Sequence, residues 1–119
     1  MPRSPKDPKE SEIQHAIMEW LFWKHKEGKL FYWRQNVLPV PISRNGRITG
    51  FRPGGAKGSA DIFCVIAPHG NLIGIEVKNS TGKQSPDQII FQQQLQAVGA
   101  EYYVVRSVDD VERVLHLST

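Results

Sequence analysis

The chain has 119 residues, of which 39% are hydrophobic and 23% charged, and its formal net charge is +3. These values are typical of one globular domain with a modest core. No run of about 20 apolar residues is present, which excludes a membrane-spanning helix, and the polar N-terminus lacks the apolar core of a signal peptide. The single cysteine, Cys64, excludes an internal disulfide framework and suits a reducing compartment, so we expect a cytoplasmic protein.

The N-terminal part of the sequence predicts a flexible tail at residues 1–8, followed by a single folded domain at 9–119. A helix comes first, with either Ser11 as its N-cap and a glutamine three residues on, or an earlier start at 7–10. Gly28 ends this helix. Its apolar stripe consists of Ile13, Ala16, Ile17, Trp20 and Leu21.

Aromatic and β-prone residues at 30–37 predict a strand, which Pro39 and Pro41 end. A tight-turn signal follows at 44–47. The segment 50–58 carries four glycines and a proline and predicts a mobile loop. No further strand is predicted before residue 60.

Positive charge is concentrated in residues 28–60, which contain six basic residues and no acidic one. Because the whole chain carries +3, this segment carries +6 and the remainder −3. A basic segment that ends beside acidic residues suits a polyanion held near a metal ion, and a solvated basic loop is the alternative. The basic residues are Lys29, Arg34, Arg44, Arg47, Arg52 and Lys57.

Two apolar runs at 60–67 and 72–78 flank a turn sequence and predict a β-hairpin. A symmetric turn at 68–71 would place Asp61 opposite Lys78 and residue 63 opposite Glu76. Because side chains alternate along a strand, Asp61, Glu76 and Lys78 would then share one face. Burying such groups is costly unless they pair or bind a metal, so this pattern favours a divalent-metal site for phosphodiester cleavage over an ordinary ion pair.

The last third of the chain predicts a helix from a Ser85 capping box to Gly99, then a strand at 102–105 and a short helix capped by Ser107. The strand returns through the helix, so it should run parallel to 72–78. The apolar face of the longer helix consists of Phe91, Leu95 and Val98. The predicted class is α/β, with the order α-β-β-β-α-β-α and a mixed four-stranded sheet flanked by helices.

Two further polar residues are candidates for the site. Glu12, in the first turns of the first helix, can reach its edge as a carboxylate ligand, or can serve only the helix N-terminus. Gln88 shares a helical face with Phe91 and Leu95 and should point inward. It can hold a water or a phosphate oxygen, or it can complete the capping box, and one side chain does not easily do both.

The glycine-rich segment 54–59 does not predict a nucleotide site. A phosphate-binding loop needs Gly-Lys followed directly by Ser or Thr, after a strand and before a helix. Here Gly58 separates Lys57 from Ser59, and the segment precedes a strand. We therefore expect no nucleotide cofactor. The four histidines have no zinc-ligand spacing.

Together these pieces resemble the PD-(D/E)XK nuclease superfamily and, within it, the VRR-NUC domain of stand-alone phage or bacterial proteins. The resemblance runs from Ser11 to Leu115. It rests on the segments 31–36, 57–61, 75–78, 85–88 and 104–106 in this order and spacing. It implies a restriction-endonuclease-like core and a location in the cytoplasm of a bacterial or phage-infected host cell.

The resemblance also implies a role for each candidate residue. Asp61 and Glu76 would bind Mg²⁺ or Mn²⁺ together with the Val77 carbonyl, and Glu12 would complete the acidic set directly or through water. Lys78 would orient or activate the attacking water, and Gln88 would support that arrangement. Hard oxygen ligands suit these ions. The charge of the basic segment, rather than the resemblance, predicts that Arg34, Arg44, Arg47, Arg52 and Lys57 bind DNA.

The resulting hypothesis is a metal-dependent endonuclease selective for DNA structure, such as a four-way (Holliday) junction, acting as a homodimer. A two-fold dimer supplies two sites for two opposed strands. One alternative is a restriction-like nuclease that reads base sequence, and another is a DNA-binding module with an inactive site. The presence of Asp61, Glu76 and Lys78 argues against the inactive module.

Overall fold

The computed structural model of the chain describes residues 7–35, 40–52 and 57–117. Its elements, in chain order, are α1 (Glu10–Lys26), β1 (Leu30–Arg34), β2 (Val40–Arg44), β3 (Arg47–Arg52), β4 (Ile62–Ile66), β5 (Asn71–Val77), α2 (Pro86–Ala97), β6 (Glu101–Val105) and α3 (Val108–Leu115). None of the described helices is both long and apolar enough to cross a bilayer.

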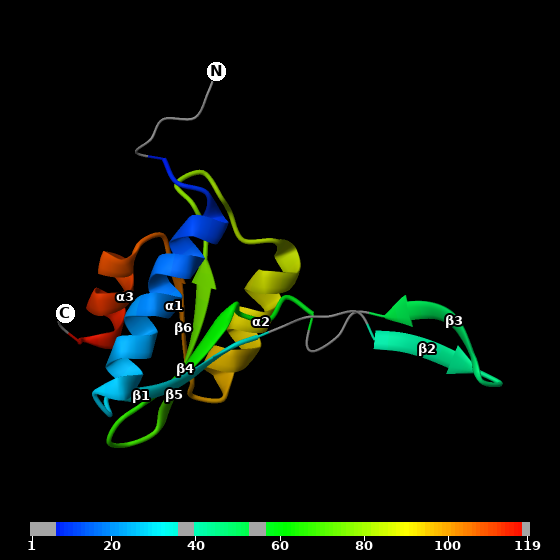
Figure 1. Cartoon of the computed structure of the whole chain (residues 1–119), viewed down its shortest axis with the longest axis horizontal. Helices are drawn as coiled ribbons and strands as arrows, with labels where there is room; N and C mark the ends of the chain where they lie inside the picture. The colour runs from blue at the N-terminus through cyan, green and yellow to red at the C-terminus, as the bar shows by residue number, and fades with distance from the viewer. Residues whose placement is uncertain (1–6, 36–39, 53–56, 118–119) are drawn as a thin grey trace.

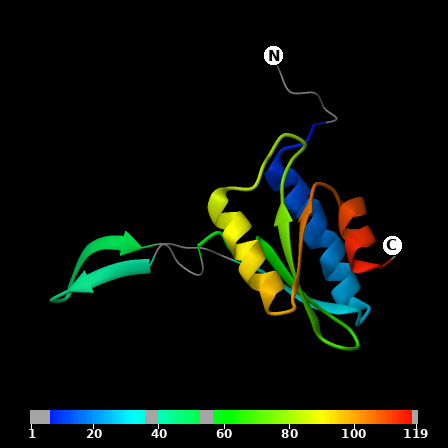
Figure 2. The same cartoon turned by 180° about the vertical axis from the view of Figure 1, so that it is seen from behind.

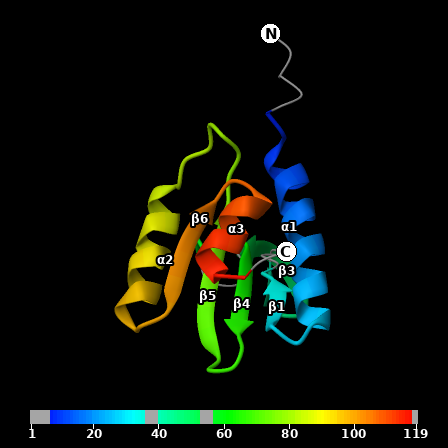
Figure 3. The ribbon, with the colours of Figure 1, turned by 90° about the vertical axis from the view of Figure 1, so that its left-hand side faces the viewer.

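Four strands form a mixed sheet in the order β1-β4-β5-β6, which Figure 3 shows side by side. The strands β1, β4 and β5 are antiparallel neighbours, and β6 lies parallel to β5, as the sequence predicts. Helices α1 and α3 pack together on one face, and α2 packs on the other (Figure 1). The predicted α/β class with a mixed four-stranded sheet flanked by helices is therefore confirmed.

Each face of the sheet has its own apolar cluster. Alternate residues of β4 and β5, among them Ile62 and Ile75, face α1 and α3 and form the larger core. The intervening residues, among them Phe63, face α2 in a smaller cluster with Tyr102. Because Glu76 lies between two core residues of β5, its side chain lies on the α2 face, at the end of the strand.

The β4–β5 hairpin differs in register from the symmetric arrangement that we expected. Its loop is 67–70, one residue earlier than predicted, because Gly70 takes a φ of +75° and donates its N–H to the Ile66 carbonyl at 2.8 Å. Ile62 is therefore paired with Ile75, so that Asp61 lies at the level of Glu76 and Val77 rather than opposite Lys78. The shift preserves the alternation, and Asp61, Glu76 and Lys78 still share one face.

The helix ends agree with the sequence in most places. Ser85 and Gln88 form the predicted capping box with Pro86 at the first position, and Ser107 caps α3. The Ser11 cap is wrong, because α1 begins at the earlier of the two expected starts, behind Lys9 and without a side-chain cap. Two predicted apolar contacts are also wrong: Ala16 is exposed, and so is Val98, beyond the end of α2.

A second, two-stranded sheet of β2 and β3 was not predicted. The predicted tight turn at 44–47 is confirmed by the positive φ of Asn45 and Gly46. It joins two strands, however, rather than irregular segments. Pro41 lies within β2, and 50–52 belong to β3 instead of a loop. The hairpin stands apart from the main sheet in both views (Figures 1 and 2).

Several predicted features fall wholly or partly outside the described residues. These are positions 1–6 of the expected tail, the end of the strand 30–37, Pro39, and residues 53–56 of the expected loop. Within the described part of the tail, Asp7 accepts a hydrogen bond from the Ser80 hydroxyl at 2.6 Å. This contact joins the start of the chain to the loop that follows β5.

Candidate metal and catalytic site

Asp61 is held firmly at the entrance to β4. Its side-chain Oδ2 accepts the backbone N–H of Val77 at 2.8 Å, and its carbonyl accepts the N–H of Gln35 at 2.8 Å. The side chain is half-buried. The ends of β1, β4 and β5 therefore meet at Asp61, and one of its carboxylate oxygens is oriented by the strand that carries Glu76.

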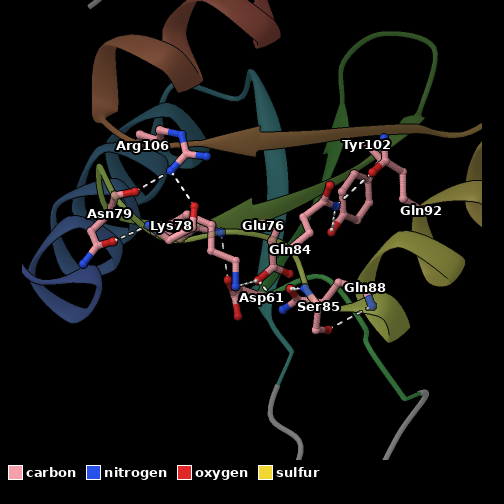
Figure 4. Close-up of polar contacts among 12 residues, drawn as sticks. Asp61, Glu76, Lys78, Asn79, Gln84, Ser85, Gln88, Gln92, Tyr102 and Arg106 are labelled. Atoms are coloured by element: carbon pink, nitrogen blue, oxygen red, sulfur yellow. Dashed lines mark hydrogen bonds and ion pairs between the residues drawn. The ribbon is translucent and has the colours of Figure 1, made fainter.

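Glu76 is the most unusual polar residue of the fold, because only 1% of it is exposed. Its Oε2 accepts a hydrogen bond from Gln88 Nε2 at 2.8 Å and lies 3.7 Å from Lys78 Nζ. Its Oε1 is buried and receives no hydrogen bond from any residue that the structure describes. Figure 4 shows Asp61, Lys78 and Gln88 arranged around this carboxylate. Such an oxygen calls for a proton or a cation.

The pKa of Glu76 is raised from 4.5 to about 8. Burial is the largest cause, followed by the negative charge of the adjacent Asp61, to which a protonated Glu76 could donate a hydrogen bond. The Lys78 ammonium opposes the rise in pKa, and the Glu10 carboxylate contributes to it. Without a bound cation, the Glu76 carboxyl therefore retains its proton near neutral pH, and a divalent ion could replace that proton.

Gln88 performs the two roles that seemed incompatible in the sequence. Its amide oxygen accepts the N–H of Ser85 at 2.8 Å and closes the capping box, while its amide nitrogen donates to Glu76. The two ends of one amide serve different partners, which is possible because α2 begins directly over the end of β5. Gln88 therefore fixes Glu76 to the first turn of the helix.

Gly58 permits this close approach of α2. It has a φ of +75°, and a Cβ at this position would lie 2.3 Å from the Asp87 carbonyl oxygen. Only glycine adopts that backbone conformation readily and has no Cβ that would clash with Asp87. Gly58 is thus explained by helix packing at the site rather than by a phosphate-binding loop.

A buried tyrosine adjoins the carboxylates and was missed by the sequence reasoning. Tyr102 on β6 is 4% exposed, and its pKa is raised to about 12 by burial and then by the negative charge of Glu76. Gln84 donates to the Tyr102 hydroxyl at 3.4 Å and to Gln92 at 2.9 Å. The predicted parallel pairing of β6 with β5 indicated this proximity, but the register was needed to select Tyr102 over Tyr103.

Lys78 lies two residues beyond Glu76 and therefore on the same face of the sheet. Its side chain is 12% exposed, so the ammonium reaches both solvent and the carboxylate. The loop that follows is held by Arg106, whose guanidinium donates to the carbonyls of Asn79 and of Gly82, the latter at 2.9 Å. This anchoring keeps Lys78 at the mouth of the site.

Glu12 is not placed as a third ligand of the same cluster. It is exposed on α1 and borders a shallow depression with Arg106 and Ser107. In residues 7–35, 40–52 and 57–117, no three His, Cys, Asp or Glu side chains lie close enough to form a metal-binding group. The α1 carboxylate whose charge affects Glu76 is Glu10, which sequence reasoning missed.

The predicted DNA-binding residues fall into three separate places. Arg34 lies beside Gln14 and His15 of α1, on the sheet face opposite Glu76. Lys57 precedes β4 in the chain, and its Nζ lies 3.5 Å from Oδ2 of Asp87 in the first turn of α2. The three arginines at 44, 47 and 52 lie on the β2–β3 hairpin.

No protein-family model matches the sequence, and no curated protein is significantly similar to it. The chemistry of the site therefore rests on its geometry. Two carboxylates lie beside an ammonium group where the central strands β4 and β5 meet at one end of the sheet. One of these carboxylates is buried and has an oxygen that lacks a donor. This arrangement can hold a hard divalent cation close to the protein surface, with the positive charge of Lys78 next to it.

Proposed function

We propose that this protein is a metal-dependent DNA endonuclease that hydrolyses phosphodiester bonds, with a restriction-endonuclease-like core of the VRR-NUC type. The observation that carries the proposal is the Glu76 carboxylate, which is buried, held by Gln88, adjacent to Asp61, and left with one oxygen without a donor. A structural ion pair would not require this second carboxylate. The proposal accounts for both acids and for the lysine beside them.

Asp61 and Glu76 fit Mg²⁺ or Mn²⁺, because such ions are commonly held by one or two carboxylates plus waters and substrate phosphate oxygens. The pair therefore suffices without Glu12, and the Val77 carbonyl is a further candidate ligand. A bound divalent ion neutralises phosphate charge and lowers the pKa of a bound water. Gln88 positions Glu76 through its 2.8 Å hydrogen bond, and the Val77 N–H positions Asp61.

Lys78 supplies the positive charge of the site. Its ammonium lies 3.7 Å from Glu76 Oε2 and is partly open to solvent, so it can orient a water or contact a phosphate oxygen. A fixed positive charge aimed at developing negative charge is worth several kcal/mol in a transition state.

We further propose that the preferred substrate is branched DNA, such as a four-way junction, and that the protein acts as a homodimer. Apolar side chains remain exposed along the end of α1 and on β1, an edge strand, and these would form the interface. They are Phe22, Trp23, Phe31 and Trp33. Light scattering should give twice the chain mass at working concentration. A monomer that cuts four-way junctions symmetrically would contradict the dimer.

The test of the activity is incubation with linear, flap, fork and four-way DNAs of matched sequence, in Mg²⁺, in Mn²⁺ and in EDTA. We expect cleavage only with metal, strongest on the four-way DNA, and lost in Glu76→Gln. Cleavage at one sequence in every substrate would instead support a sequence-reading nuclease. Binding without any cleavage by the wild type would support the inactive DNA-binding module.

A further inference from the structure

The β2–β3 hairpin, residues 40–52, is a two-sided arm. Pairing alternates along the two strands, with Val40 opposite Arg52, Ile42 opposite Gly50, and Arg44 opposite Arg47. Paired residues share a face, and successive pairs face opposite sides. One face therefore carries all three arginines of the arm, together with Val40 and the exposed Ile42. The other face carries Pro41, Ser43, Ile48 and Phe51.

A bulge preserves this separation of charge. The register shifts between Ile42 and Ser43, where Thr49 is the extra residue of β3 and donates its hydroxyl to the Ile42 carbonyl at 3.3 Å. If Thr49 were paired as a regular residue of the ladder instead, Ile48 and Arg47 would exchange faces relative to Phe51 and Arg52. The bulge thus keeps Ile48 and Phe51 together on one side, and the arginines, with Val40 and Ile42, on the other.

The apolar face of the arm is open to solvent. Phe51 is 64% exposed and Ile48 is 61% exposed, although both lie in a strand. Among the described elements, β2 and β3 pack extensively only on each other, and the arm extends away from the sheet (Figure 1). Exposed aromatic and branched apolar side chains on so small a sheet are unfavourable unless a partner covers them.

Charge indicates the partner. Residues 40–52 contain three arginines and no acidic residue, so the arm as a whole is attracted to a polyanion. A two-stranded ribbon also has the dimensions that enter a DNA groove. Apolar side chains such as Phe and Ile insert where base stacking is interrupted, and an aromatic ring stacks on any exposed base. A continuous duplex buries its base faces in the stack, whereas a branch point exposes them.

We propose that the arm is a branch-sensing wedge: its arginine face binds backbone phosphates while Phe51 and Ile48 contact the exposed bases at a DNA branch. This inference rests on the proposed action on branched DNA and assigns the structure selectivity to the arm rather than to the carboxylate site. The two faces have separable effects. The arginines bind any DNA, and the apolar residues bind only where stacking is interrupted.

The experiment measures binding in EDTA, so that no cleavage occurs, using a four-way junction and a linear duplex of the same arm sequence. Phe51→Ala with Ile48→Ala should lose roughly tenfold or more in junction affinity, the equivalent of one lost stacked base, and little in duplex affinity. The triple variant Arg44→Gln, Arg47→Gln, Arg52→Gln should weaken both and lower the salt slope by roughly 2.7, from about 0.9 per phosphate contact.

Matched controls separate the arm from general effects. Val98→Ala removes an apolar residue that is 82% exposed just beyond the end of α2, and Arg113→Gln removes a charge from α3. Neither should change junction preference. Phe51→Trp retains a ring and should restore binding, whereas Phe51→Leu should not. A 2-aminopurine base at the branch should be quenched by the wild type and by Phe51→Trp, and circular dichroism should show that every variant is folded.

Equal losses on junction and duplex from the apolar-face variant would overturn the wedge. A change from dimer to monomer in that variant would also overturn it, because the face would then be an interface between copies of the chain. The cleavage assay distinguishes the two proposals. If the wild type cuts junctions but the apolar-face variant retains full preference, the wedge is wrong and the nuclease stands. If the binding pattern holds but no DNA is cut with metal, the wedge stands and the nuclease is wrong.

Discussion

Replacing Glu76 by glutamine tests the site through stability, independently of any substrate. The change removes the charge and preserves the shape of the side chain. The new amide oxygen can still accept from Gln88. The new amide nitrogen replaces the Glu76 oxygen that lacks a donor, and it can donate to Asp61. We therefore expect Glu76→Gln to be folded and, in the absence of metal, more stable than the wild type above neutral pH.

The magnitude follows from the pKa of Glu76, which rises from 4.5 to about 8 on folding. Between these values the folded protein retains a proton that the unfolded chain has released, so the wild type loses stability as pH rises through this window. One proton contributes at most about 1.4 kcal/mol per pH unit. Over the window from pH 4.5 to about 8, we expect a total loss of about 2–5 kcal/mol by pH 9.

The measurement is urea unfolding in EDTA at pH 5, 6, 7, 8 and 9, with Glu19→Gln, an exposed position on α1, as the control. The wild type and the control should lose stability together, whereas Glu76→Gln should be nearly flat across this range. Adding Mg²⁺ or Mn²⁺ at pH 8 should stabilise the wild type and leave Glu76→Gln unchanged. Parallel stability curves for the wild type and Glu76→Gln would refute the assignment of a buried, protonated carboxyl.

Three further substitutions probe the surroundings of Glu76. Asp61→Asn should reduce metal-dependent cleavage by at least about 100-fold while the Val77 N–H keeps an acceptor, so thermal unfolding should change little; normal turnover would remove Asp61 from the site. Lys78→Ala should lose activity by about 100–1,000-fold yet retain metal affinity at pH 9, and calorimetry showing both falling together would contradict its role. Gly58→Ala should displace the start of α2 from Glu76, which should lower the free energy of unfolding by a few kcal/mol and weaken metal binding. Gly28→Ala is the control: its new Cβ would have no atom within 4 Å, so it should lower the free energy of unfolding less.

Local sequence determined much of the fold. The apolar stripe of α1, the Ser85 capping box, the Ser107 cap and the parallel return of β6 all followed from spacing and from residues with strong local preferences. The shared face of Asp61, Glu76 and Lys78 followed from strand alternation alone. That prediction survived the error in the hairpin loop, because the register shifted by two residues and side-chain parity was unchanged.

The contacts of the site were decided by the tertiary structure. Whether Gln88 capped its helix or held Glu76 depended on how closely α2 approaches β5, and Gly58 allows an approach at which it does both. Three further features depend on residues distant in the chain. Tyr102 lies near Glu76, the charge that affects Glu76 from α1 is that of Glu10 rather than Glu12, and Arg34 lies on the opposite face of the sheet. The β2–β3 hairpin was missed because its strands have little apolar periodicity and pair only with each other. Strand alternation assigns side chains to a face of the sheet, but only the packing of helices and neighbouring strands brings particular atoms within reach of one another.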